Sequence, residues 1–109
     1  HTHVPTADDQ ILPGGTAFQS DVGMTGPCES ILGREIERVM HTTITFRPTF
    51  FQVAKNDVRI HASLVTVDPQ SGKAQRIRRV VVDEEDAELL ELHNSRATAE
   101  EVSELRSEA

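Results

Sequence analysis

The sequence has 109 residues, which is the length of one small domain and excludes a two-domain enzyme. Its formal net charge is −7, from 18 acidic and 11 basic side chains. This balance repels nucleic-acid phosphates and anionic lipids, so we expect neither a nucleic-acid duplex nor a membrane as partner. No apolar run approaches the roughly 20 residues of a membrane span, and a lone Cys28 fits a reducing compartment, so we expect a cytoplasmic protein.

The charge is unevenly distributed along the chain. Residues 1–82 hold 9 basic and 8 acidic side chains, a net of +1, whereas residues 83–109 hold 2 basic and 10 acidic ones, a net of −8. The division predicts two parts, a nearly neutral unit over residues 1–82 and an acidic, helix-prone tail over residues 83–109.

The first quarter of the chain is rich in turn signals. Leu12–Thr16 contains Pro-Gly-Gly, which predicts a turn, and Thr16–Val22 then predicts a short strand. Gly23–Pro27 predicts a second loop. This loop lacks the Gly-Lys-Ser/Thr ending of a phosphate-binding P-loop, so the residues alone favour a structural turn.

Apolar residues in Ser30–Met40 recur at helical spacing and predict a helix. Gly33 weakens the early part by about 1 kcal/mol relative to alanine, so we expect the firm helix to begin near it. Arg47-Pro48 ends any continuation.

Three β-rich runs follow and predict an antiparallel meander: Phe50–Ala54, Val58–Leu64 and Ala74–Val82. Apolar and polar residues alternate clearly in the second run, as in a half-buried strand. The runs are separated by turn signals at Asn56-Asp57 and Asp68–Lys73.

The acidic tail has a thin apolar stripe. Asn94-Ser95 interrupts its helical pattern, and Thr98 followed by Glu101 matches a capping box. These features leave a helical hairpin and a partly disordered tail as equal alternatives.

The first candidate for chemistry is the pair His1 and His3. In an extended segment, side chains i and i+2 share a face, so two imidazoles there can bind one metal or serve two adjacent metals. Two ligands are too few for a complete site. Asp8, Asp9 and Asp21 are carboxylates nearby in sequence. The alternative is a surface pair or the remnant of an affinity tag.

The remaining histidines and the cysteine lack partners in the sequence. We interpret His41 as structural. His61 lies on the polar side of a predicted strand and His93 lies in the tail, so we interpret both as solvated. Cys28 follows Pro27 near a predicted helix start, but no histidine is placed to activate its thiol as a nucleophile.

Three stretches together resemble a known family. They are HTHVPTAD at 1–8, ILPGGTAF at 11–18 and DVGMTGP at 21–27. In this order, followed by a helix and a β-rich segment, they resemble the YmdB-type branch of the calcineurin-like metallophosphoesterases, which are bacterial cyclic-nucleotide phosphodiesterases. The resemblance covers about the first 82 residues and leaves the tail without a counterpart.

The resemblance implies a four-layer α/β/β/α sandwich around two metal ions, iron or manganese. The family's last metal-binding motif maps onto His1 and His3, one for each metal, with Asp21 and Thr25 as supporting or loop positions. The reaction would be hydrolysis of a 2′,3′- or 3′,5′-cyclic nucleotide, in which two metals polarise the phosphoryl oxygens and generate a hydroxide.

The family's earlier motifs, with their aspartate, glutamate, asparagine and further histidine ligands, are absent from this sequence. We therefore expect an α+β fragment from the C-terminal part of such a sandwich, inactive alone, whose partner is the missing N-terminal part of the same domain. Homo-oligomerisation stays open. The alternative is a non-catalytic interaction module whose acidic tail docks on a basic partner.

A severed sandwich also has a consequence for stability. Phe50, Val58, Ile60 and Leu64 would lose packing partners, and exposed apolar surface costs roughly 25 cal/mol per Å². The isolated chain is then expected to bind a hydrophobic dye, aggregate or dimerise.

Overall fold

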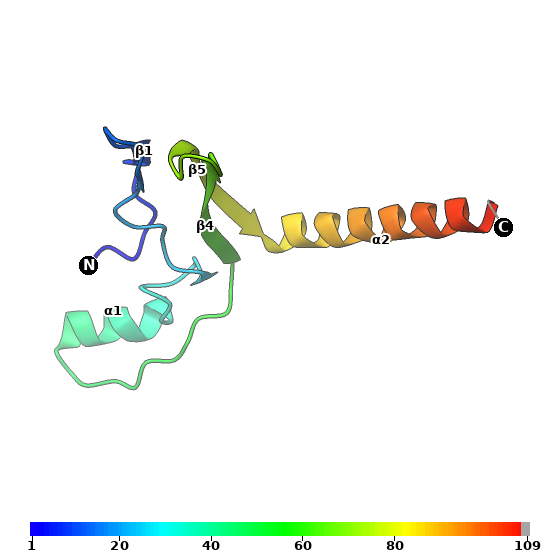
Figure 1. Cartoon of the computed structure of the whole chain (residues 1–109). Coiled ribbons are helices and arrows are strands. Elements are labelled where there is room, and N and C mark those ends of the chain that lie inside the picture. Colours follow the sequence, from blue (N-terminus) through cyan, green and yellow to red (C-terminus); the bar gives the residue numbers. More distant parts are fainter. Residues whose placement is uncertain (108–109) are drawn as a thin grey trace.

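The computed structural model describes residues 1–107, with side chains of the last helix described as far as Arg96 and again at Ser103 and Arg106. The strands form two antiparallel sheets, β1-β2 and β3-β4-β5 (Figure 1). The mixed α and β content confirms the predicted α+β class. The elements in chain order are β1 (Gln10–Ile11), β2 (Ala17–Phe18), β3 (Gly26–Pro27), α1 (Ile36–Thr45), β4 (Val58–Val67), β5 (Ala74–Asp83) and α2 (Glu84–Ser107).

The hairpin of β4 and β5 is the longest sheet element. The pairing runs from Arg59 opposite Asp83 to Val67 opposite Ala74, with an irregularity at Thr66/Val67. Asp68 closes the predicted turn, because its backbone N–H donates to the Lys73 carbonyl at 2.9 Å and its carboxylate accepts from the Gln70 N–H at 3.0 Å. Both predicted strands and this turn are confirmed.

The third strand of that sheet is not the predicted one. β3 pairs with β4 through Gly26 opposite Arg59 and Pro27 opposite Val58, whereas Phe50–Ala54 forms only an isolated bridge from Val53 to Arg34. The backbone of Phe50–Ala54 forms its hydrogen bonds elsewhere: the Ala54 N–H donates to the Gly33 carbonyl at 2.9 Å. The predicted meander is therefore wrong in its first strand, because that run lies along the loop before α1 rather than beside β4.

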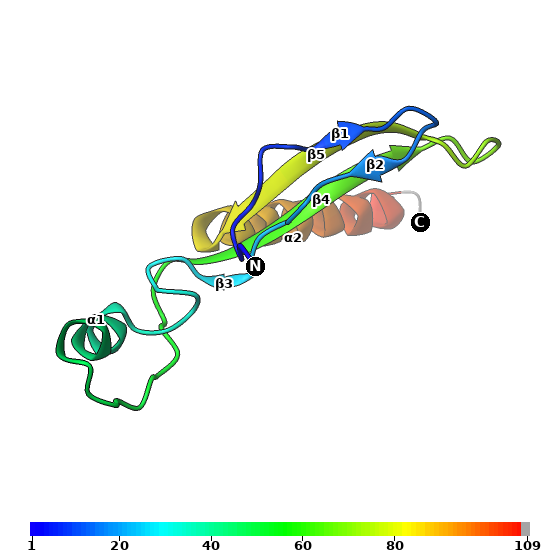
Figure 2. The ribbon, with the colours of Figure 1, turned by 90° about the vertical axis from the view of Figure 1, so that its left-hand side faces the viewer.

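The two short N-terminal strands cover one face of the hairpin (Figure 2). Successive side chains of a strand point to opposite faces, and His61, Ser63 and Arg79 lie on the covered face. Ser63 donates from its hydroxyl to the Gln19 side chain, and the Arg79 guanidinium lies 3.2 Å from the Asp9 carboxylate. The N-terminal segment is thus held on the sheet by polar contacts.

The strand predicted at Thr16–Val22 is shorter than expected. It ends at Phe18, because the following residues bond to the segment before β1 instead of forming a ladder. Asp8 accepts from the Ser20 backbone N–H at 3.2 Å, and Gln19 donates from its amide to the Thr6 carbonyl at 3.0 Å. The predicted turn is confirmed by the Leu12 N–H, which donates to the Thr16 carbonyl at 2.8 Å.

Helix α1 begins later than predicted. The spacing placed its start near Gly33, but it runs from Ile36 to Thr45. Leu32 and Gly33 have φ values of 53° and 85°, and a right-handed helix cannot pass through such residues. Phe46, with φ 57°, ends the helix in a left-handed cap just before the predicted stop at Arg47-Pro48.

The tail forms one continuous helix over the described residues, which confirms its predicted helical character. The predicted interruption at Asn94-Ser95, which would make it a hairpin, is wrong, and so is the partly disordered alternative. α2 passes through Asn94-Ser95 and through Thr98 without interruption. Its start is capped reciprocally: the Asp86 N–H donates to the Asp83 carboxylate at 2.8 Å and the Asp83 N–H donates to the Asp86 carboxylate at 3.2 Å. This is a capping box at its actual N-terminus. Among the described residues, no helix combines the length and apolarity needed to cross a membrane.

The chain is extended and has almost no core. Its radius of gyration is 20.8 Å, where about 13 Å is typical of a compact domain of this length. Its accessible surface is 8697 Å², against about 6,000 Å² for a compact protein of the same mass. Among the residues whose burial is described, Ala54 is the one buried apolar side chain. Of the four residues expected to lack partners, Phe50, Ile60 and Leu64 are exposed and Val58 is half-buried.

Candidate metal centre

His1 and His3 lie side by side at the start of the chain. Their ring centroids are 3.7 Å apart, and the ring planes are inclined by 35°. In a fully extended segment, residues i and i+2 would stand about 6.6 Å apart. His3 has a φ of 59°, in the left-handed region that histidine tolerates better than most residues, and this turn accompanies the closer approach of the two rings. The structure thus brings together the two imidazoles singled out from the sequence.

Asp21 anchors this turn from the neighbouring loop. The Thr2 hydroxyl donates to one carboxylate oxygen and the Gly23 backbone N–H donates to the other at 2.8 Å. These two hydrogen bonds, the Thr2 bond first, lower the pKa of Asp21 below its ordinary value. Both oxygens are therefore engaged within the protein, and Asp21 connects the histidine turn to the loop at Gly23.

The backbone of His3 is fixed as well. Its carbonyl accepts from the Met24 N–H at 3.0 Å, and the Thr6 N–H donates to the Asp21 carbonyl at 3.0 Å. Farther along, the Ser20 hydroxyl, the Thr6 hydroxyl and the Ser20 N–H donate to Asp8 and lower its pKa to about 2. The segment that carries the histidines is thus bound along its length to residues 19–24.

Thr25 connects the same loop to β4. Its hydroxyl accepts from the His61 backbone N–H at 3.2 Å and lies 3.4 Å from the His61 carbonyl, to which it donates. Its oxygen and proton are both used on the strand. Thr25 thus joins the loop to the strand.

His61 is a participant that the sequence did not indicate. The strand pattern predicts a solvated side chain, but His61 is half-buried, and its Nδ1 lies 2.6 Å from the Met24 carbonyl oxygen, 37 residues away in sequence. Gly23 lies against the same ring: a Cβ at this position would be 3.3 Å from His61 Cγ and 2.8 Å from Pro5 Cδ. No local pattern relates a strand residue to a loop so distant in sequence.

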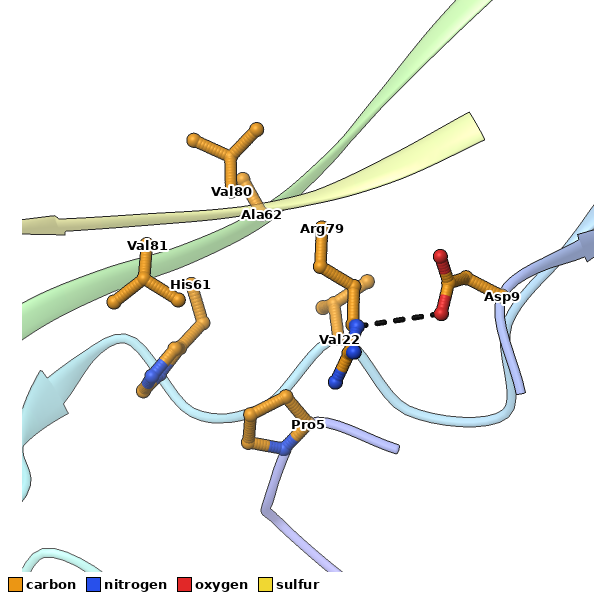
Figure 3. A pocket seen from close by; sticks show the side chains of 8 residues that line it. All are labelled: Pro5, Asp9, Val22, His61, Ala62, Arg79, Val80 and Val81. Atoms are coloured by element: carbon orange, nitrogen blue, oxygen red, sulfur yellow. Dashed lines mark ion pairs between the residues drawn. The ribbon is translucent and has the colours of Figure 1, made fainter. Parts of the chain in front are cut away.

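Two small cavities flank the His61 ring. One, of about 290 Å³, is shown in Figure 3, where His61, Val81 and Arg79 point toward Pro5 and Val80 points to the other side of the sheet. The second, of about 260 Å³, reaches His3 and is lined also by Met24, Cys28 and Leu32. Asp9 and Arg79 form an ion pair at the edge of the first cavity, and the half-buried Cys28 is a free thiol.

The donor set fits a metal only in part. Two neighbouring imidazoles are suitable ligands for iron, manganese or zinc, and complete sites use three or more ligands. Within the part of the chain that the structure describes, no group of three or more histidine, cysteine, aspartate or glutamate side chains is arranged to hold a metal ion. His1 and His3 therefore do not make a complete metal site within the described residues.

Comparison with known proteins identifies relatives over the same region. The family described as YmdB-like protein matches residues 1–80. The 2′,3′-cyclic-nucleotide 2′-phosphodiesterase of Bacillus subtilis is 41% identical over 85 residues, which cover 78% of this chain and 32% of that protein. A putative phosphatase/phosphodiesterase of Mycoplasma pneumoniae is 32% identical over 91 residues, covering 83% and 32% of the two proteins.

Solved structures agree with this match. A hypothetical protein from Thermus thermophilus is 42% identical and superimposes with a TM-score of 0.69, covering 77% of this chain and 32% of that one. The crystal structure of a novel phosphatase from Mycoplasma pneumoniae gives a TM-score of 0.70 at 31% identity, covering 76% and 30% of the two chains. The predicted fold class is thus confirmed.

The chain spans about a third of the length of the curated relatives that it matches. The family match covers well over half of the chain and includes both histidines, the Asp21 loop and most of the hairpin. The chain belongs to the family of YmdB-like proteins.

Proposed function

We propose that the chain is part of a phosphodiesterase that hydrolyses cyclic nucleotides, 2′,3′- or 3′,5′-cyclic, and that His1 and His3 each bind one of two metal ions. The observation that carries the proposal is the 3.7 Å separation of the two imidazoles, in a chain 41% identical to a 2′,3′-cyclic-nucleotide 2′-phosphodiesterase. The ions of two-metal hydrolases lie about 3.5–4 Å apart, so adjacent rings are suited to serve one ion each.

The two proposed metal ions are iron or manganese. When bound, such a pair polarises a phosphoryl oxygen and supplies a hydroxide at neutral pH. The residues of this chain bind and orient: His1 and His3 offer ring nitrogens, while Asp21 and the Met24 N–H hold the turn between them. We assign Asp21 and Thr25 no contact with the substrate, because their side-chain polar atoms are engaged within the protein.

The remaining ligands are proposed to come from a longer chain. The relatives are about three times as long as the matched region, and the two histidines do not form a site alone. We assign residues 1–82 to the catalytic domain, as its C-terminal part, and residues 83–109 to an appended segment that contains α2 and lies beyond the family match. Residues 1–109 alone are then inactive.

The test uses the full-length protein encoded by the gene that contains this segment. His1→Ala and His3→Ala are expected to lower the content of bound iron or manganese and to reduce hydrolysis of 2′,3′- and 3′,5′-cyclic AMP to background. His93→Ala is the matched control, because His93 is exposed on α2, far along the chain from the site. Metal content by elemental analysis is measured on the same samples.

Two outcomes would contradict the proposal. If both histidine variants keep the wild-type metal content, His1 and His3 are not ligands. If the gene encodes none of the further aspartate, asparagine and histidine ligands, no dinuclear site forms and the non-catalytic interaction module is the better explanation.

A further inference from the structure

We propose that His61 is a positioning residue for the metal centre: its imidazole holds the Met24 peptide, and Met24 in turn holds His3. The inference rests on the proposed function, since it assigns a role toward the metal ligand His3. It uses a side chain on β4 that touches neither histidine ligand in the described contacts.

The first step is the direction of the ring hydrogen bond. Nδ1 of His61 lies 2.6 Å from the Met24 carbonyl oxygen. A carbonyl oxygen only accepts, so Nδ1 carries the proton and donates. In the neutral form of the ring the lone pair then lies on Nε2, and the bond fixes both the tautomer and the ring orientation.

The second step connects Met24 to the ligand. The Met24 N–H donates to the His3 carbonyl at 3.0 Å, so one residue accepts from His61 and donates to His3. Both bonds act on the backbone of one residue, one on each side of its Cα, so together they restrain its conformation, and the second ends on the residue with the left-handed backbone turn. The His61 ring thus restrains the turn that brings the two imidazoles together.

The third step is the support around the ring. The Thr25 hydroxyl bonds both the N–H and the carbonyl of His61, at 3.2 and 3.4 Å, which fixes the strand to the loop one residue beyond Met24. Gly23, with a φ of 91°, leaves room for the ring, since a Cβ there would lie 3.3 Å from His61 Cγ. The ring therefore has a fixed place on the loop that it holds.

The experiment separates the hydrogen bond from the bulk of the ring. In asparagine, the side-chain nitrogen stands as many bonds from Cα as Nδ1 does, whereas in glutamine it stands where Nε2 does. His61→Asn is therefore expected to keep the donor to Met24, His61→Gln to displace it and His61→Ala to remove it.

The measurement is Mn²⁺ binding to the metal-free full-length protein, by titration calorimetry or by the electron paramagnetic resonance of free Mn²⁺. Supporting residues behind metal ligands typically contribute 10–100-fold in affinity, and we expect a loss in that range for His61→Ala and His61→Gln. His61→Asn is expected to restore most of the affinity. Melting temperatures of the metal-free variants are measured in parallel.

Equal Mn²⁺ affinity in all variants, with or without a lower melting temperature, would make His61 a purely structural residue and overturn the inference. Loss in His61→Asn equal to that in His61→Ala would also overturn it. In the wild-type protein, ¹⁵N resonances of the His61 ring are expected to show a protonated Nδ1 at neutral pH, and a bare Nδ1 contradicts the proposal even if no variant folds.

The Mn²⁺-binding experiment gives a different result if the proposed function itself is wrong. In that case His1→Ala and His3→Ala leave Mn²⁺ binding unchanged. If those variants lose Mn²⁺ and the His61 variants do not, the proposed function stands and the role of His61 alone is refuted.

Discussion

At the scale of single residues, two contacts fix the loop Asp21–Thr25: Asp21 accepts from the Thr2 hydroxyl, and Gly23 lies against Pro5. The motif indicated a loop but neither of these contacts. His1 and His3 could be singled out because their spacing is local. His61 could not, because its partner, Met24, is 37 residues distant and is a backbone carbonyl, which carries no side-chain signal.

Gly23 allows a test at this scale, with Gly14 as its matched control. Both have positive φ, 91° and 102°, but a Cβ on Gly23 would meet Pro5 Cδ at 2.8 Å, whereas Gly14 has open space. A side chain at either of these φ values costs about 1–3 kcal/mol of backbone strain. Gly14→Ala is therefore expected to lower the free energy of unfolding by only that amount. Gly23→Ala is expected to lose more, because Pro5 must shift. The measurement is the free energy of unfolding of the full-length protein in urea, and equal losses would contradict the expected steric clash.

At the scale of elements, the long alternating strands were predictable and the short ones were not. The alternating residues from Val58 onward and the turn signals of Asp68–Lys73 identified the hairpin. β3 has only two residues, Gly26 and Pro27, and neither is typical of strands, so its place beside β4 depends on tertiary contacts. The strand propensity of Phe50–Ala54 was overridden for the same reason, and the Arg34 guanidinium lies 4.7 Å from the Phe51 ring centroid instead.

The start of α2 gives the prediction at this scale. Asp83→Ala removes the cap and is expected to destabilise the helix by about 0.5–2 kcal/mol, whereas Asp83→Asn keeps an acceptor and is expected to change it little. Circular dichroism at 222 nm on the 109-residue chain measures the helix content. Thr98→Ala is expected to leave the helix content unchanged, because the helix passes through this residue. A lower helix content in this variant would favour the capping box predicted from the sequence.

At the scale of the whole molecule, the open face of the hairpin is the dominant feature. Ile60 and Leu64 are each 49% exposed, on the face opposite the N-terminal segment. A sequence pattern can indicate that a face is apolar but not whether anything covers it. The large surface and the near absence of a core fit a unit that packs against further chain, in accord with the match to a third of each relative.

The isolated chain is therefore expected to increase the fluorescence of a hydrophobic dye. Ile60→Thr with Leu64→Thr places β-branched residues, which suit a strand, at both positions but removes apolar surface, so the fluorescence is expected to fall. Ile60→Val with Leu64→Ile preserves an apolar face and is expected to leave the signal nearly unchanged. A wild-type chain that is monomeric by light scattering and does not bind the dye would contradict this picture of the surface.

The junction between β5 and α2 has a mechanical consequence. β5 ends at Asp83 and α2 begins at Glu84, so no loop residue separates strand from helix, and Figure 1 shows the helix leading away from the hairpin. At 1.5 Å per residue, the 24 residues of α2 span about 36 Å. Because no loop lies between them, the direction in which β5 ends sets the direction of α2, and the far end of the helix stands about that length away from the hairpin.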